Sequence, residues 1–409
     1  MNISRLLRKN QSVTGAALLF YIFAFMVYYF TRPGEPSPFN YFVYLADAFW
    51  QGRLYVTDTP FYFEELVTLN GKQYVIYPPL PAILMIPFVA VWGLGSSQVL
   101  ISIMAGAFNV LIFYVLMARL TPRNDIRTWV TAMFAFGSIH WYTSTIGSVW
   151  YVAHMFSLSF LLLAIYETVG LKRPLLIGLL LGASYWCRIT TILSIGFFLI
   201  MLSDKWISAP GGSFFKRIKV IPLLCFFLGV LVFVFLNALY NFLRFGSPFD
   251  VAYSLHTISD VKAQVSPWFD QGLLSLTYIK HHLYAFVIEP PVFRADWPYV
   301  VPSMTGLSVF ITTPAFVLIF LARLRDRVTM ACWAGIIPVA LLIFTKSGTG
   351  WTQFGYRYAL DFYPFLFLLA FITMRDGIRW YHKLLIALGI AVNLWGVLFI
   401  NKFGWYVLY

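Results

Sequence analysis

The sequence predicts an all-α polytopic integral membrane protein with about 11 transmembrane helices and interfacial helices in its first outer loop. Its 409 residues are 60% hydrophobic and 11% charged, and the mean hydropathy is +0.77. A soluble core does not need this much apolar surface, so the bilayer must be the main solvent. Because apolar stretches recur along the whole chain, we expect a single multi-span membrane domain over residues 1–409.

Eleven apolar stretches are the candidate spans. They cover residues 13–30, 98–118, 128–141, 152–169, 174–188, 190–203, 219–242, 306–322, 329–345, 358–374 and 384–401. A further apolar stretch, 79–95, is interrupted by Pro79, Pro81 and Pro87. Proline removes a backbone donor and kinks a helix, and a span here would also break the charge alternation described next. We therefore expect 79–95 to form an interfacial or re-entrant helix.

The basic residues predict the orientation of these spans. If the N-terminus is cytoplasmic, every second connection is basic as well. The basic segments contain Arg5, Arg8 and Lys9; Arg119, Arg123 and Arg127; Lys172 and Arg173; Lys205, Lys216, Arg217 and Lys219; Arg323, Arg325 and Arg327; and Arg375, Arg379 and Lys383. Short loops rich in Lys and Arg are typical of the cytoplasmic side. We therefore expect a multi-pass plasma (inner) membrane protein with a cytoplasmic N-terminus. The net charge of +13 then reflects topology, with membrane lipids and not nucleic acid as the expected partner.

The same topology places the larger loops outside the cytoplasm. These are the first extracytoplasmic loop, 31–97, with its interfacial helices, and a second large extracytoplasmic loop, 243–305, together with short turns near 140–152 and 346–357. Most of the carboxylates fall in these segments. An acidic, aromatic outer surface is suited to chemistry outside the cytoplasm.

The first loop contains the leading candidate for a catalytic base. Asn40, Tyr44, Asp47 and Gln51 follow one another at spacings of four, three and four, which places them on one stripe of an otherwise apolar helix. Such a helix lies along a membrane surface with its polar edge toward water. Asp47 is then either a solvated surface charge or the base; Glu64 and Glu65, farther along the loop, are the competing carboxylates, and a rigid turn at Tyr77 to Pro81 closes it.

Cationic side chains at the outer ends of later spans form the second group. Charges near the hydrocarbon are costly and are usually paired or functional. The candidates for binding a donor phosphate are Arg188, Arg244, Arg357 and His154, with Asn241, Asp250 and Asp361 as supporting residues. Arg357 and Asp361 have the spacing of a same-face ion pair, and His154 is either a packing residue or a catalytic one. One carboxylate facing several cations suits group transfer from a phosphate-linked donor: the acid takes a proton from an acceptor hydroxyl, and the cations stabilise the leaving phosphate.

Five stretches carry a resemblance to a known class. They read NYFVYLADAFWQGRLYV, YPPLPAILMIPF, TIGSVWYVAHMF, LYNFLRFGSPFDVAY and QFGYRYALDFYPFLFLL. Together they resemble the membrane glycosyltransferases of the GT-C fold, in particular bacterial proteins similar to the dolichyl-phosphate-mannose–protein mannosyltransferases and the aminoarabinose transferases. The resemblance implies an inverting transfer of a sugar from a polyprenyl-phosphate donor, with a first-loop carboxylate, here Asp47, as base. Members of the class often carry an Asp-Glu pair near the start of this loop, where this chain has Phe39 and Asn40, so a divalent metal is left open.

Our leading hypothesis is a polyprenyl-phosphate-sugar-dependent glycosyltransferase acting at the outer membrane face. The acceptor could be a glycan, a lipid or a protein. The alternative is a transporter or flippase of lipid-linked sugars, which would need charged residues at mid-membrane depth and a structural repeat. Most ionisable groups here lie at span ends instead. A third hypothesis, a scaffold without catalytic activity, leaves the outer cations unexplained.

Overall fold

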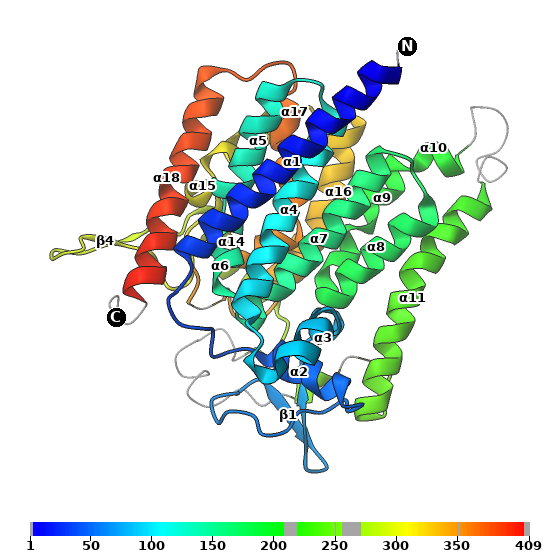
Figure 1. Ribbon diagram of the computed structural model, residues 1–409, viewed down its shortest axis with the longest axis vertical. Helices are drawn as coiled ribbons and strands as arrows, with labels where there is room; N and C mark the ends of the chain where they lie inside the picture. The colour runs from blue at the N-terminus through cyan, green and yellow to red at the C-terminus, as the bar shows by residue number, and fades with distance from the viewer. Residues whose placement is uncertain (1–2, 208–218, 250, 256–270, 351, 405–409) are drawn as a thin grey trace.

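The computed structural model describes residues 3–207, 219–249, 251–255, 271–350 and 352–404, with the side chains of 3–12 and 254 left out. Within these ranges the protein is a bundle of helices with two small β-hairpins, which confirms the predicted helical membrane class (Figure 1). Six helices are long and apolar enough to cross a bilayer. They are α1 (Ile3–Thr31), α4 (Gln98–Leu120), α7 (Val149–Val169), α11 (Val220–Phe245), α16 (Arg327–Phe344) and α18 (Trp380–Phe403).

The remaining elements are shorter. The α-helices among them are α2 (Tyr41–Trp50), α3 (Leu80–Trp92), α5 (Asn124–Phe136), α6 (His140–Ile146), α8 (Pro174–Cys187), α9 (Ile195–Met201), α10 (Ser203–Trp206), α12 (Ala252–Leu255), α14 (Ile279–Val287), α15 (Val309–Thr312) and α17 (Tyr363–Met374). The 3₁₀ helices are η1 (Gly93–Gly95), η2 (Ile189–Ser194), η4 (Leu276–Tyr278), η5 (Pro314–Leu321) and η6 (Arg357–Asp361). The strands are β1 (Leu66–Leu69), β2 (Lys72–Val75), β3 (Val292–Phe293) and β4 (Val300–Val301).

Four predicted spans are interrupted: 190–203 divides among η2, α9 and α10, and 358–374 divides between η6 and α17. Segment 128–141 divides between α5 and α6, and segment 306–322 divides between α15 and η5. The break in 306–322 falls at Thr313, directly before Pro314, because a residue that precedes proline is disfavoured in helical conformation. Helix α3 has 13 residues, about 20 Å at 1.5 Å per residue, which is shorter than the ~30 Å hydrocarbon core. That length agrees with an interfacial or re-entrant role for 79–95, and both that role and the number of spans stay predictions.

The basic connections meet at one end of the bundle. Arg123 donates to the backbone oxygen of Asp376 at 3.1 Å, and Arg375 pairs with Asp326 at 3.2 Å. Asp204 accepts from both Lys172 and Arg327. These contacts join five connections that are far apart in sequence. The alternation of basic loops therefore corresponds to a shared face of the molecule, opposite the end that carries α2 and β1 (Figure 1).

We call that opposite end the hairpin end, after β1 and β2. The two strands pair antiparallel with Leu69 opposite Lys72, and their two-residue turn has both central residues at positive φ, Asn70 at 52° and Gly71 at 72°. Asn-Gly is the favoured pair for such a turn. Beside the hairpin, α2 buries its apolar face while its polar stripe is partly exposed. The predicted helix is present, with Tyr44 and Asp47 on its partly exposed side, and its place at the membrane surface stays a prediction.

Two helices, α8 and α11, pack closely near the start of α8. Helices α8 and α11 approach backbone to backbone at Gly178 and Gly229: a Cβ on Gly178 would lie 2.0 Å from the backbone oxygen of Phe226, and one on Gly229 would lie 2.5 Å from that of Leu175. Small residues allow this approach between helices in membranes. Helix α8 therefore ends, at Arg188, in a position fixed against α11.

Candidate functional site

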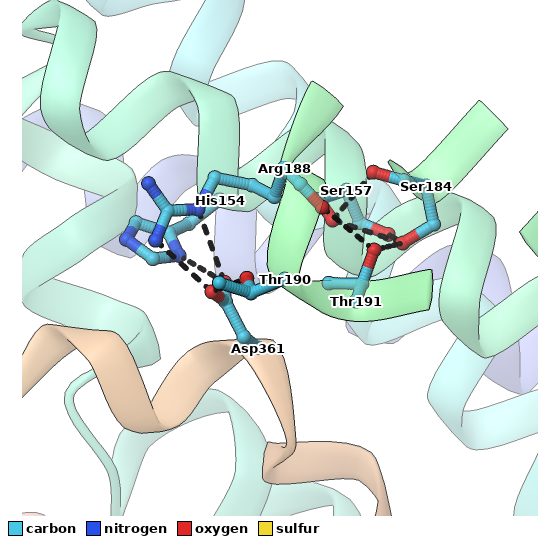
Figure 2. Close-up of polar contacts among 7 residues, drawn as sticks. All are labelled: His154, Ser157, Ser184, Arg188, Thr190, Thr191 and Asp361. Carbon is cyan, nitrogen blue, oxygen red and sulfur yellow. Dashed lines mark hydrogen bonds and ion pairs between the residues drawn. The ribbon is translucent and has the colours of Figure 1, made fainter. Parts of the chain in front are cut away.

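A buried carboxylate, Asp361, is the centre of the most densely bonded polar group at the hairpin end (Figure 2). Arg188 donates to it twice, from Nε at 3.2 Å and from an Nη atom at 3.0 Å. The Nδ1 of His154 lies 2.9 Å from the same carboxylate, and the Thr190 hydroxyl donates to it as well. The side chain of Asp361 is 1% exposed and that of Arg188 is 18% exposed. We call these four residues the Asp361 cluster; they come from η6, α7 and the junction of α8 with η2.

The junction of α8 with η2 turns Arg188 toward Asp361. Arg188 has an extended backbone, with φ −145° and ψ 104°, so the α-helix stops there and a 3₁₀ turn begins. The hydroxyl of Thr191 donates to the Arg188 carbonyl at 2.9 Å, and the hydroxyl of Ser184 links Thr191 to Ser157 on α7. Figure 2 shows these hydroxyls on the side of Arg188 away from Asp361. The hydroxyl groups of Thr191, Ser184 and Ser157 are therefore all hydrogen-bonded at the break in the helix.

The sequence prediction of an ion pair between Arg357 and Asp361 is wrong. Their spacing of four fits one face of an α-helix, but the segment forms a 3₁₀ helix, in which residues three apart eclipse each other. Asp361 turns instead to Arg188 and His154. Arg357 donates to the side-chain oxygen of Gln353 at 2.9 Å. Arg357 is nevertheless in the site, by a different contact.

Three cationic side chains surround the ring of Tyr358. The distances to the ring centroid are 5.1 Å from Arg357, 5.9 Å from Arg188 and 5.3 Å from Lys346. Lys346 also donates to the Tyr358 hydroxyl at 3.4 Å. We call Arg188, Lys346 and Arg357 the cation group. Cations over an aromatic face are stabilised by its quadrupole, and three of them together create a region of positive potential.

Sequence reasoning missed Lys346 and Tyr358. A signal for Lys346 was present, because it is a basic residue in a turn that the charge alternation places outside the cytoplasm. Its position is fixed by His282, a buried residue of α14. The Nε2 of His282 lies 2.8 Å from the Lys346 backbone oxygen, which can only accept, so Nε2 carries the proton. The Tyr356 hydroxyl, 2.6 Å away, then donates to Nδ1. Burial lowers the pKa of His282 to about 4, which keeps the ring neutral.

The three first-loop carboxylates occupy different surroundings. Asp47 accepts from Gln51 at 2.7 Å and lies 3.9 Å from Arg53, both close to it in sequence. Glu64 is exposed. Glu65 accepts from the indole N–H of Trp150 on α7 at 2.6 Å, and the ring of the next residue, Tyr151, lies 5.3 Å from the Arg357 guanidinium. Of the three, Glu65 is therefore the one bonded to the helix that contacts the cation group.

Arg244, another predicted donor-site residue, and Asn241, a predicted supporting residue, make structural contacts instead. Arg244 on α11 donates to the backbone oxygen of Val75 at 2.8 Å and to the side chain of Asn241 at 2.7 Å. It stacks on Tyr240 at 3.8 Å. These contacts tie α11 to β2. Asp250 lies outside the described residues.

The remaining supporting residues lie around α2. Asn40 directly precedes the helix and makes no capping hydrogen bond there. The Tyr44 ring lies edge-on to Phe63 at 5.2 Å. Tyr77 contacts Tyr41 and Tyr253 through its ring, at 6.3 and 6.5 Å. Tyr77 thus links the first loop to Tyr253, whose hydroxyl lies within electrostatic reach of Arg188.

In the part of the chain that the structure describes, no group of three or more His, Cys, Asp or Glu side chains could hold a metal ion. The side chains present at the site are a first-loop carboxylate, a set of cations and a histidine. Because the Asp361 carboxylate can only accept, the Nδ1 of His154 carries a proton, and no described residue hydrogen-bonds to its Nε2.

The fold has known counterparts. The crystal structure of ArnT from Cupriavidus metallidurans bound to undecaprenyl phosphate aligns with 91% of this chain at a TM-score of 0.55 and 11% identity. The oligosaccharyltransferase from Archaeoglobus fulgidus in its apo form aligns with 95% at a TM-score of 0.50 and 12% identity. The chain spans 62% and 56% of the lengths of these two proteins. No family model and no curated protein matches the sequence. The chain has the GT-C membrane fold and resembles ArnT, which confirms the resemblance inferred from sequence.

Proposed function

We propose that this protein is a glycosyltransferase that moves a sugar from a polyprenyl-phosphate donor to a hydroxyl acceptor at the extracytoplasmic membrane face, with inversion. The observation that carries the proposal is the convergence of Arg188, Lys346 and Arg357 on Tyr358, with the first-loop acid Glu65 bonded to α7, the helix whose Tyr151 faces Arg357. Two proteins with the same fold support it: an oligosaccharyltransferase, and ArnT, whose structure holds undecaprenyl phosphate.

The cation group is proposed to bind the donor phosphate. Arginine forms paired hydrogen bonds with phosphate oxygens, and lysine acts as a point charge. The Asp361 carboxylate would hold the Arg188 guanidinium in one orientation through its two hydrogen bonds. In the transfer step, the bond between the anomeric carbon and the phosphate oxygen breaks, and the electron pair goes to that oxygen. The cations stabilise the charge that develops there.

Glu65 is proposed to act as the general base. It would take the proton from the acceptor hydroxyl while the acceptor oxygen forms its bond to the anomeric carbon from the face opposite the phosphate. The support is its hydrogen bond to Trp150, which precedes Tyr151, the residue whose ring faces Arg357. Asp47, the base predicted from the sequence, lies on α2, and its carboxylate accepts a hydrogen bond from Gln51. We expect Glu65→Gln to remove turnover and Asp47→Asn to retain most of it.

The proposal is tested with purified full-length protein in lipid nanodiscs. A panel of polyprenyl-phosphate sugars is supplied, and release of polyprenyl phosphate is measured with and without candidate acceptors. Release with at least one donor is expected. Lys346→Met should then lower kcat/KM by roughly 10²–10³-fold, the scale for removing one charge-stabilising group. Lys72→Met, which removes an exposed lysine from β2 at the same end, is the matched control and should leave the rate unchanged. No release with any donor would contradict the proposal.

A further inference from the structure

A cavity at the hairpin end lies apart from the cation group, none of whose residues lines it. It has a volume of about 430 Å³ and lies between the start of α2, the loop after α1, and the turn from η1 into α4. Its wall includes Glu35, Asn40, Tyr44, Tyr62 and Gln98. This volume is within the range of small-ligand sites in proteins.

The chemistry of the wall favours a neutral ligand that donates hydrogen bonds. Glu35 supplies a carboxylate, which accepts only, and no lysine or arginine occurs among the described residues of the wall. A phosphate or another anion would therefore meet repulsion here. Asn40 adds an amide that makes no hydrogen bond to the described residues. The rings of Tyr44 and Tyr62 add flat aromatic faces, whose negative centres attract C–H groups.

Gln98 holds the inner wall of the cavity in place. The residue is 3% exposed, and its Nε2 donates to two backbone oxygens, those of Gly147 at 2.7 Å and Phe39 at 3.3 Å. Its Oε1 is closed off from solvent. Gln98 therefore acts on the cavity through these two hydrogen bonds, which fix the backbone of the wall, and the groups that can meet a ligand are those of Glu35, Asn40, Tyr44 and Tyr62.

The cavity connects to the proposed base through a series of aromatic rings. Tyr62 lies edge-on to Phe39 at 6.2 Å, and Phe39 contacts Trp150 at 4.8 Å. Trp150 in turn donates to Glu65. The cavity wall and the proposed base are therefore linked by packed side chains, with Phe39 and Trp150 between them.

We infer that this cavity binds a neutral sugar unit of the acceptor, so that the acceptor is a glycan and the cavity is its subsite. The inference rests on the proposed function and adds the acceptor class to it. The donor phosphate and the acceptor glycan then occupy sites of opposite character, one cationic and one acidic and aromatic, with Glu65 between them.

Direct binding is the first test. Full-length protein in nanodiscs is used, because maltoside detergents carry a sugar head group of their own. Saturation-transfer NMR is recorded with neutral methyl glycosides and disaccharides of common hexoses and pentoses, and with glucose 6-phosphate as the anionic comparison. We expect transfer to the ring protons of at least one neutral sugar and less to glucose 6-phosphate. Tyr62→Ala and Gln98→Met should reduce the signal several-fold.

Matched controls keep the test specific. Phe61→Ala removes the neighbouring aromatic, which is 98% exposed and does not line the cavity, and Gln73→Met removes a glutamine from β2 outside it. Both should retain the signal. Absence of transfer to every neutral sugar, or an equal signal in Tyr62→Ala and Gln98→Met, would overturn the inference.

The transfer assay separates this inference from the proposed function. If the enzyme is active, Tyr62→Ala should raise the acceptor KM about tenfold and leave the donor KM unchanged. An active enzyme with an unchanged acceptor KM in that variant would overturn the subsite while the proposed function stands. Sugar binding that depends on Tyr62 and Gln98, in a protein that releases no polyprenyl phosphate, would contradict the proposed function while the subsite stands.

Discussion

Replacing Asp361 with asparagine tests the core of the site. Asparagine has nearly the same shape, so the change removes the charge and leaves the packing. The Arg188 guanidinium then loses the carboxylate that pairs with it while it remains largely buried. His154 and Thr190 lose the charged oxygens to which they are hydrogen-bonded. Breaking a buried pair by removing one partner typically costs about 3–5 kcal/mol, because the remaining charge is left unpaired.

The expected shift in melting temperature follows from this cost. The entropy of unfolding is roughly 2.1 cal/mol/K per residue for globular proteins, and for 409 residues that gives about 0.9 kcal/mol/K. A loss of 3–5 kcal/mol then lowers the Tm by about 4–6 °C. The measurement is thermal unfolding of nanodisc-embedded protein, followed by tryptophan fluorescence at a single scan rate because unfolding of such proteins is commonly irreversible.

A double-mutant cycle identifies the cause. Arg188→Gln combined with Asp361→Asn removes both charges, so the double variant should be destabilised by clearly less than the sum of the two single variants. Arg123→Gln, which breaks an exposed pair with Asp125 at the opposite end, is the control and should not shift the Tm measurably. Additive losses, or an Asp361→Asn variant as stable as the parent protein, would refute the claim that the pair organises this site.

Three further outcomes are expected. Glu65→Gln should lose turnover while retaining donor binding, and Asp47→Asn should remain active; the reverse pattern in the transfer assay would return the role of base to Asp47. For His282, burial lowers the folded pKa to about 4 from 6.5, so the unfolded chain binds the proton first. The folding free energy linked to this neutral ring is fully present above pH 6.5, and roughly 3 kcal/mol of it is lost as the pH falls toward 4. The Tm of His282→Gln should therefore fall less steeply between pH 6.5 and pH 4 than that of the parent protein. An unchanged slope would contradict the assignment. Gly178→Leu places a side chain against the backbone of α11 and should cost about 1–3 kcal/mol or more, whereas Gly15→Ala, with open space around it, should be tolerated; an unshifted Tm in Gly178→Leu would contradict the close packing.

The membrane class and much of the site could be predicted because they depend on local chemistry. Apolar length and basic connections indicated the bundle and its two ends, and the polar stripe of α2 indicated which face is buried. The outer span ends supplied Arg188, Arg357 and Asp361 as site residues. Each of these signals is a property of one segment.

Partner choice could not be predicted, because it depends on how distant segments meet. Asp361 pairs with Arg188, 173 residues away in sequence, since η6 is a 3₁₀ helix and turns Arg357 elsewhere. Glu65 is the acid bonded to the helix that contacts the cations because Trp150 on α7 donates to it. Lys346 enters the site because His282 on a separate loop holds its backbone. The sequence contains all of these residues, but no spacing pattern connects them.

The most direct test of the central claim is a cryo-electron microscopy structure of the protein in nanodiscs with bound undecaprenyl phosphate. We expect the phosphate density within hydrogen-bond distance of Arg188, Lys346 or Arg357, with the lipid chain leaving toward the bilayer at the hairpin end. Phosphate density at the opposite end, among the basic connections and away from the cation group, would contradict the account.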